Sequence, residues 1–424
     1  MKRSKRVVGA ILLIWFVISF VTNILGPLMP IIIKTYELSL TMAAFLPFSF
    51  FLAYGIMSIP SGMLIERIGE KKSMLIAFGL NFTGAVFFSF YPSYEIALVS
   101  LFAIGAGMAM LQVIINPLMR TAGGEENFAF FSVMGQLVFG LASFLSPFVF
   151  SYLVRTLSEH PEVNIITASL AKLVGDNPEW TALYWIFTLI FIFMFTTIYL
   201  LKIPVVKLKE DEKTGAVETY IILIKKKQVL LFFLAMVAYV GTEQALANWM
   251  SEFLNTYHGF EPESVGAGAV GWFWGLMSAG CLLGLFLLKL WGSKRVLKMA
   301  VICTLVVFSM AVFGPGEMAL YAFPVTGFFI SVMFSIIFSL ALNSMAVHHG
   351  SFAGILCSGI FGGALIPLII GALGDWLGLR TAFLFIYITL GYIYFISVYA
   401  KPLVDNKTLK VSELLNMPMK TEKV

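Results

Sequence analysis

Long apolar segments alternate with short polar ones along almost the whole chain. Each apolar run is close to or above the roughly 20 residues that an α-helix needs to cross the hydrocarbon core of a bilayer. The pattern predicts about twelve membrane-spanning helices, near residues 7–33, 40–60, 73–91, 96–119, 129–154, 181–203, 228–256, 265–290, 296–313, 318–344, 352–373 and 381–401. The two-residue alternation of a β-barrel is absent from the sequence, so we expect an all-α membrane protein.

The chain divides near its middle, where residues 204–227 are polar and charged. We expect an N-terminal six-helix bundle over residues 1–203, a linker over 204–227 with a short helix at the cytoplasmic lipid surface, a C-terminal six-helix bundle over 228–402 and a cytoplasmic tail over 403–424. The stretch from Gly284 to Arg295 follows span eight as residues 62–72 follow span two. This correspondence predicts two pseudo-symmetric bundles with a solute site between them near the bilayer midplane.

Composition and charge support the membrane assignment. Hydrophobic residues make up 59% of the chain and charged residues only 12%, so a soluble fold would expose a very large apolar surface. With the N-terminus inside, most basic residues fall on the cytoplasmic side, and the exceptions are Lys34, Arg155, Lys172 and Arg380. The net charge of +5 is thereby explained by topology, without a nucleic-acid-binding face. We expect a multi-pass protein of the cytoplasmic (inner) membrane with both termini in the cytoplasm.

Helix-breaking residues interrupt several predicted spans. They are Gly26, Pro27 and Pro30 in span one, Pro60, Asn116-Pro117, Pro147, and Pro367 with Gly362, Gly363 and Gly371 in span eleven. Close helix packing through small residues accounts for about half of these positions. We expect the rest to loosen or kink helices that rock.

Polar side chains within spans are costly against lipid and normally face the interior of a bundle. The candidates for contact with a polar solute are Asn23, Gln112, Asn116, Gln136, Tyr239, Gln244, Asn248 and Asn343. Amides donate and accept hydrogen bonds and aromatic rings offer apolar faces, which together suit the hydroxyls and C–H surfaces of a sugar. Any single amide is explained equally well by an interhelical hydrogen bond, but their number in both halves favours a polar cavity. Trp272 and Trp274 face differently, so at most one of them is expected to meet the solute.

Glu243 is the only carboxylate deep within a span. It lies about 15 residues, roughly 22 Å, into span seven, and pseudo-symmetry predicts that Asn23 faces it across the cavity. A carboxyl group in this position is a candidate for proton coupling. The alternative is a structural hydrogen bond with Tyr239 or Gln244. Glu252 and Asp375 lie near span ends and are expected to be solvated.

The charged turn between spans two and three carries a recognisable motif. Its key residues are Gly62, Glu66, Arg67, Gly69, Lys71 and Lys72. The segment resembles the signature Gly-x-Leu-x-Asp-Arg-x-Gly-x-Lys/Arg-Lys/Arg of the major facilitator superfamily, with Glu66 in place of the usual Asp. The resemblance implies a carrier of the major facilitator fold in which this gating motif stabilises one conformation.

A narrower resemblance extends over both halves of the chain. The segments that carry it are Thr22–Pro27, Gln112–Pro117, Gln136, Tyr239–Glu243, Ile337–Leu340 and Ile360–Asp375. They are similar to segments of the fucose–galactose–glucose:proton symporter family. Fucose carriers of that family have an Asp and a Glu, thought to serve sugar binding and proton coupling, at the positions that match Asn23 and Gln112. These two amides can bind a hydroxyl, but they cannot titrate.

The resemblance implies a secondary transporter that moves a monosaccharide or sugar derivative by alternating access, coupled to protons. A sugar uniporter, a sodium-coupled carrier, a carrier of another polar solute and a carrier-derived sensor remain alternatives. The sequence contains no Gly-x4-Gly-Lys-Ser/Thr loop for ATP and no nucleophile–base or metal-binding pattern at cavity depth. We therefore expect no enzyme activity, no catalytic residue, no metal and no cofactor, and a monomer whose partners are sugar, proton and lipid.

Overall fold

The computed structural model describes residues 5–123, 128–203, 217–345 and 348–403, and over these residues the chain is helical, with no strand. Twelve helical segments are long and apolar enough to cross a membrane, as the hydrophobic pattern predicts. Those of the N-terminal half are α1 (Lys5–Thr22) with α2 (Leu25–Tyr36), α3 (Leu40–Ile68), α4 (Glu70–Phe90), α5 (Tyr94–Gly123), α6 (Phe128–Glu159) and α8 (Ala182–Leu200). Those of the C-terminal half are α10 (Lys227–His258), α11 (Ala267–Leu290), α12 (Ser293–Phe313), α13 (Gly316–Ile330) with α14 (Met333–Leu342), α15 (His349–Ser358) with α16 (Gly362–Leu377), and α17 (Leu379–Ala382) with α18 (Phe385–Tyr399).

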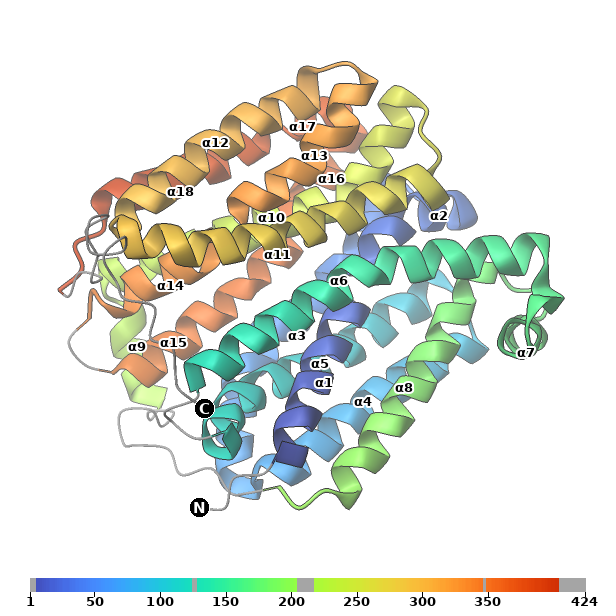
Figure 1. The fold of residues 1–424 in the computed structure, drawn as a ribbon, viewed down its shortest axis with the longest axis horizontal. Helices are drawn as coiled ribbons and strands as arrows, with labels where there is room; N and C mark the ends of the chain where they lie inside the picture. The colour runs from blue at the N-terminus through green and yellow to red at the C-terminus, as the bar shows by residue number, and fades with distance from the viewer. Residues whose placement is uncertain (1–4, 124–127, 204–216, 346–347, 404–424) are drawn as a thin grey trace, which may run out of the picture.

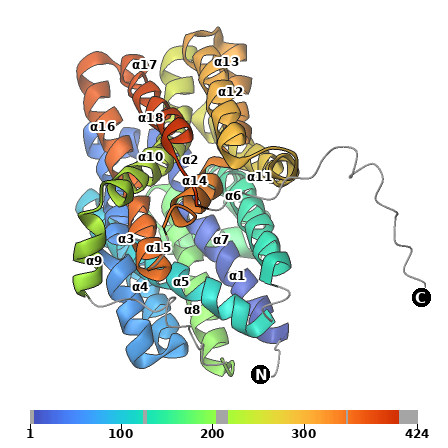
Figure 2. The same cartoon turned by 90° about the vertical axis from the view of Figure 1, so that its left-hand side faces the viewer.

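The two halves lie beside each other, the first coloured blue to green and the second yellow to red in Figure 1. We call the side of the molecule where α1 begins and α18 ends, toward the lower left of Figure 1, the termini side, and the side toward the upper right the opposite side. Figure 2 shows the molecule with the left-hand side of Figure 1 turned toward the viewer. Helix α2 packs against α10 on the opposite side, whereas α1 packs on α5, α6 and α8 of its own half. A Cβ built on Gly26 of α2 would lie 2.3 Å from the carbonyl oxygen of Ala247, so only glycine permits this approach. The halves are therefore closed together on the opposite side.

Besides the break near the start of span twelve, three spans of the described structure are interrupted further from their ends. Span one breaks between α1 and α2 at Asn23 and Ile24, span ten between α13 and α14 at Ser331 and Val332, and span eleven at the 3₁₀ turn of residues 359–361. Pro27 explains the first break, since it lacks the N–H that the carbonyl of Asn23 would bind in a continuous helix. Irregular backbone at membrane depth is tolerated where it lines a cavity, which suggests that the three breaks surround one.

The gating motif is more helical than the sequence indicates. Residues 62–68 belong to α3 and α4 begins at Glu70, so the turn is the single residue Gly69. Its φ of 82° lies in the region that only glycine adopts readily. The expectation that residues 62–72 form a turn between the two spans is thus corrected, because the helix of span two continues through the polar end of its sequence.

A matched pair of lysine contacts supports the predicted repeat. Lys71, in the first turn of α4, donates from Nζ to the carbonyl oxygens of Tyr199 (2.7 Å) and Leu201 (2.8 Å) at the end of α8. Lys294, in the first turn of α12, donates to the carbonyl oxygen of Val398 (3.1 Å) near the end of α18. In each half, a cation of the third span therefore neutralises the C-terminal end of the sixth.

Two short helices lie outside the spans. Helix α9 (Val217–Ile224) buries Tyr220 and Leu223 and exposes Ile221, Ile222 and Ile224, which suits the predicted helix at the lipid surface. Helix α7 (Ile165–Val174) begins with a capping box formed by Asn164 and Thr167. Residues 204–216 of the predicted linker and all but the first residue of the predicted tail lie outside the described residues.

Candidate solute-binding site

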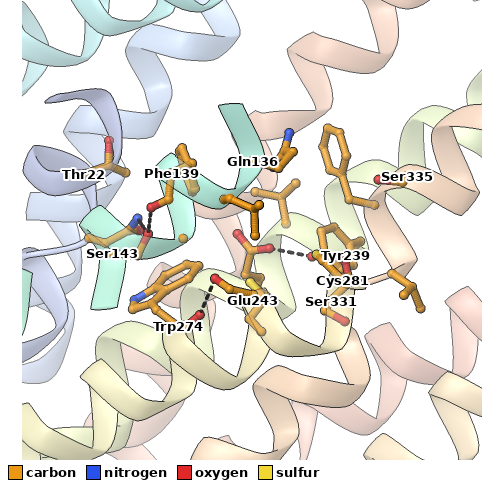
Figure 3. Close-up of a pocket in the computed structure, with 18 of the residues that line it drawn as sticks. Thr22, Gln136, Phe139, Ser143, Tyr239, Glu243, Trp274, Cys281, Ser331 and Ser335 are labelled. Atoms are coloured by element: carbon orange, nitrogen blue, oxygen red, sulfur yellow. Dashed lines mark hydrogen bonds between the residues drawn. The ribbon is translucent and has the colours of Figure 1, made fainter. Parts of the chain in front are cut away.

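A cavity of about 460 Å³ lies between the two halves, within the usual range for small-molecule sites. Side chains from α1, α3, α5 and α6 form one wall, and side chains from α10, α11 and the breaks in spans ten and eleven form the other (Figure 3). Each of the three interruptions contributes to this lining, through Asn23, through Ser331 with Val332, and through Ile360. The broken helices are thus brought together around one pocket.

The N-terminal wall carries neutral hydrogen-bonding groups. Asn23 is 3% exposed, and its Nδ2 donates to Ser143 Oγ of α6 at 2.8 Å. Ser143 Oγ lies 2.5 Å from Ser19 Oγ, and both serine hydroxyls lie within hydrogen-bond distance of the carbonyl oxygen of Phe139. Gln112 of α5 and Gln136 of α6 complete this set, and Gln136 is solvent-exposed where the pocket opens.

The C-terminal wall carries the only carboxyl group of the described lining. Glu243 Oε2 accepts a hydrogen bond from the Tyr239 hydroxyl at 2.6 Å, and Oε1 accepts one from Gln244 Nε2 at 3.2 Å. Both donors belong to α10, the helix of Glu243 itself, and the described lining includes no Lys, Arg or His. The carboxyl group is therefore held by neutral donors of its own half, and these donors are the two partners that the structural alternative names.

One tryptophan of α11 faces the pocket and the other does not. Trp274 is 3% exposed and belongs to the lining, whereas Trp272 is 54% exposed and contacts Phe144, with ring centroids 5.3 Å apart. This agrees with the expectation that at most one of them meets the solute. One turn further along α11, Ser278 lies so close to Gly140 of α6 that a Cβ there would collide with its side chain. Helices α6 and α11 therefore cross tightly beside the pocket.

The structure brings together most of the residues predicted to form the site. Asn23, Gln112, Gln136, Tyr239, Glu243 and Gln244 line the same pocket. Asn248 is buried but is not among the lining residues, and Asn343 lies at the end of α14, where it donates to Ser339 Oγ at 3.5 Å. The side chain of Asn116 lies outside the described part of the structure.

Several lining residues were not singled out from the sequence, among them Thr22, Ser143, Cys281, Ser331 and Ser335. Ser143 could have been predicted from the sequence, because Gln136, Gly140 and Ser143 are spaced by four and three residues and share one helix face. Cys281 also lines the pocket, and its Sγ lies 3.4 Å from the carbonyl oxygen of Ser331. Ser331 follows no such pattern, since its position depends on the break in span ten.

Asp375 on the opposite side makes a contact that the sequence did not indicate. Its carboxylate, at the end of α16, accepts hydrogen bonds from the backbone N–H groups of Leu40 (2.8 Å) and Thr41 (2.9 Å), and from the Thr41 hydroxyl. The side chain of Asp375 is exposed, as expected, but these hydrogen bonds were not predicted from the sequence. A carboxylate at a helix N-terminus satisfies unpaired N–H groups and the helix dipole, so Asp375 caps α3 from the other half of the protein.

A model of the Major Facilitator Superfamily matches residues 11–358, and the chain belongs to this superfamily. It is 29% identical over 392 residues to a glucose/galactose transporter of Brucella abortus, covering 90% of this chain and 91% of that protein. It is 25% identical over 378 residues to the L-fucose-proton symporter of Haemophilus influenzae, covering 84% and 86%. The resemblance noted in the gating motif and in the polar segments is confirmed.

Solved structures share the fold. A crystal structure of the Escherichia coli fucose:proton symporter matches with a TM-score of 0.65 and 20% identity, over 93% of this chain and 98% of that chain. An inward-facing bacterial homologue of the human lysosomal transporter Spinster matches with a TM-score of 0.76 and 14% identity, over 94% and 98%. The chain is thus a multi-pass membrane protein of the major facilitator fold, and its relatives are transporters.

Proposed function

We propose that the protein is a secondary transporter that carries a monosaccharide across the cytoplasmic membrane by alternating access, with a proton as the coupling ion. The observation that carries this proposal is the pocket between the halves, where amides and hydroxyls on one wall face the carboxyl group of Glu243 on the other. The names of the relatives support the solute and the ion, since one is a glucose/galactose transporter and another an L-fucose-proton symporter.

Sugar recognition rests on the amides and aromatic rings of the pocket. Asn23, Gln112, Gln136 and Gln244 offer donors and acceptors to hydroxyl groups, while Tyr239 and Trp274 offer apolar faces to the C–H surfaces of a ring. Asn23, Gln244 and Trp274 are buried, so a hydroxyl that loses its hydration beside them must regain its hydrogen bonds from the protein. Solutes without that pattern of hydroxyls are therefore disfavoured.

Proton coupling is assigned to Glu243. When the carboxyl group is ionised, its two oxygens accept hydrogen bonds from Tyr239 and Gln244; when it is protonated, it is neutral and no longer places a charge in the pocket. A proton that binds while the pocket faces one side and leaves while it faces the other couples sugar movement to the proton gradient. If coupling is absent or uses sodium, Glu243 has a binding or structural role instead.

Alternation requires that contacts on the two sides break in turn. The cap of Asp375 on α3 holds the opposite side closed, and a transporter that opens there must release it. We assign the termini side, with the gating motif of residues 62–72, to the cytoplasm because most Lys and Arg residues lie on that side. The described conformation then faces inward.

Uptake by proteoliposomes tests the proposal. Purified protein is reconstituted, and entry of radiolabelled glucose, galactose and fucose is measured with no gradient, with an imposed proton gradient and with an imposed sodium gradient. We expect accumulation of at least one hexose against its gradient only with the proton gradient. Sodium-driven accumulation or purely downhill entry would identify a sodium symporter or a uniporter. Binding without flux would identify a sensor, and neither binding nor flux of any hexose would refute a sugar carrier.

A further inference from the structure

Two buried polar atoms in the pocket lining lack a hydrogen-bond partner among the described residues. They are Asn23 Oδ1 on the N-terminal wall and Trp274 Nε1 on the C-terminal wall. Both side chains are 3% exposed. A buried polar atom without a partner is costly, so a pair of them in one pocket indicates groups that a ligand satisfies.

The hydrogen bonds around Asn23 determine which of its two amide atoms lacks a partner. The hydroxyl protons of Ser19 and Ser143 are both used, because these two groups share one hydrogen bond with each other and one with the carbonyl of Phe139. Neither proton is available for an amide oxygen, so Asn23 must direct Nδ2 toward the serines, as the 2.8 Å contact with Ser143 indicates. Asn23 Oδ1 can therefore only accept a hydrogen bond from a ligand, and Trp274 Nε1–H can only donate one.

The tight crossing of α6 and α11 brings these atoms to the same part of the pocket. Gly140 meets Ser278 at the crossing, and Gly275 meets the ring of Phe144 one turn closer to the opposite side. Ser143, the partner of Asn23, and Trp274 both lie on that side of the crossing. Figure 3 shows the Ser143 and Trp274 side chains on one side of the pocket and Tyr239 with Ser335 on the other.

We propose that Asn23 Oδ1 and Trp274 Nε1 form a hydroxyl-binding subsite at the closed end of the pocket, distinct from the carboxyl group of Glu243. The sugar donates a hydrogen bond to Asn23 and accepts one from Trp274. A hydroxyl group can do both, whereas an ether oxygen only accepts and an ammonium group only donates. The subsite rests on the proposed function and deepens it. It assigns to one specific sugar hydroxyl the contacts with both halves of the protein.

The test combines Trp274→Phe with sugars that lack single hydroxyls. Trp274→Phe keeps an aromatic face but removes the N–H donor, and Trp272→Phe, at the exposed neighbouring position, is the matched control. Affinities of the hexose that binds wild-type protein, and of each of its monodeoxy analogues, are measured by calorimetry. We expect about ten-fold weaker binding of the complete sugar by Trp274→Phe and no change for Trp272→Phe.

The deoxy series decides between a hydrogen bond and a packing effect. For one analogue, wild-type protein should already bind about ten-fold more weakly, and Trp274→Phe should cause no further loss. Asn23→Leu should likewise weaken binding of the complete sugar but not of that analogue. This second variant keeps the proposal testable if Trp274→Phe does not fold. Equal binding of the complete sugar by wild-type protein and Trp274→Phe, or an equal loss for every analogue, would overturn the subsite. If wild-type protein binds no hexose at all, the proposed function itself fails.

Discussion

The two walls of the pocket differ in what they can do chemically. The N-terminal wall presents Asn23, Gln112, Gln136 and Ser143, which form hydrogen bonds but keep the same charge at any physiological pH. The C-terminal wall presents Glu243, whose two oxygens are held by its own helix. The two halves therefore present different chemical groups to the pocket.

This difference shows how recognition and coupling can be separated in one cavity. If the N-terminal wall binds sugar without titrating, its affinity need not change when a proton binds or leaves. The proton then acts on the other wall, and the sugar and proton sites communicate only through movement of the halves. Each prediction below alters one wall, or the contact that joins the halves, and leaves the rest of the protein intact.

The largest effect is expected from Glu243→Gln. Glutamine keeps the shape and the hydrogen bonding of the side chain but cannot take up a proton. Uphill sugar uptake and its dependence on external pH should be abolished, while exchange of labelled for unlabelled sugar persists. Both are measured in the same proteoliposomes. If Glu243→Gln still accumulates sugar with the wild-type pH dependence, Glu243 does not couple transport to protons. The proposed difference between the two walls would then be wrong.

The second effect tests recognition on the N-terminal wall. Replacing Asn23, Gln112 or Gln136 by Leu should weaken sugar binding by roughly 1–3 kcal/mol, since each change leaves a sugar hydroxyl unpaired. Asn343→Leu is the matched control, because Asn343 does not line the pocket. Calorimetry with the transported hexose gives the affinities. Wild-type affinity in all three pocket variants would exclude this wall from the binding site.

A third, smaller effect concerns the contact that closes the opposite side. Asp375→Asn removes the charge that caps α3, at an expected cost of about 1 kcal/mol to the described conformation. The fraction of molecules open on the opposite side should rise several-fold. Spin labels at Tyr91 and Phe313, which are exposed at that side in different halves, report this opening as longer distances.

Asp176→Asn controls for that experiment, since it removes an exposed negative charge outside the spans. Its distance distribution should match that of the unsubstituted labelled protein. Unchanged distances in Asp375→Asn as well would show that the cap does not hold the halves together.

The smallest effect is expected from Arg67→Ala. Arg67 lies in the last turn of α3, where a cation complements the helix dipole, and it does not contact the pocket. Transport should fall a few-fold while equilibrium sugar binding stays within a few-fold of wild type. Arg295→Ala, in the first turn of α12 after the matching connection of the other half, shows whether loss of a cation beside either connection has the same effect. Loss of binding by folded Arg67→Ala would contradict a gating role.

The sequence by itself determined the twelve spans, their division into six and six, and the helix around Glu243 that holds its carboxyl group. These features depend on local properties. A backbone in lipid must satisfy its own hydrogen bonds, so a long apolar run has one stable conformation, and residues four apart on a helix, such as Tyr239 and Glu243, meet without tertiary help. The break at Asn23 also follows locally from Pro27.

Only the tertiary structure decided which polar side chains share the pocket. Asn248 and Asn343 satisfy the same sequence criterion as Asn23, yet helix rotation and packing place them outside the lining. The contact of Asp375 with Thr41 joins residues more than 300 positions apart and depends on how the two halves meet. Helical periodicity orients residues within one span, but the relative placement of spans is set by close contacts such as that between Gly140 and Ser278, which no local pattern encodes.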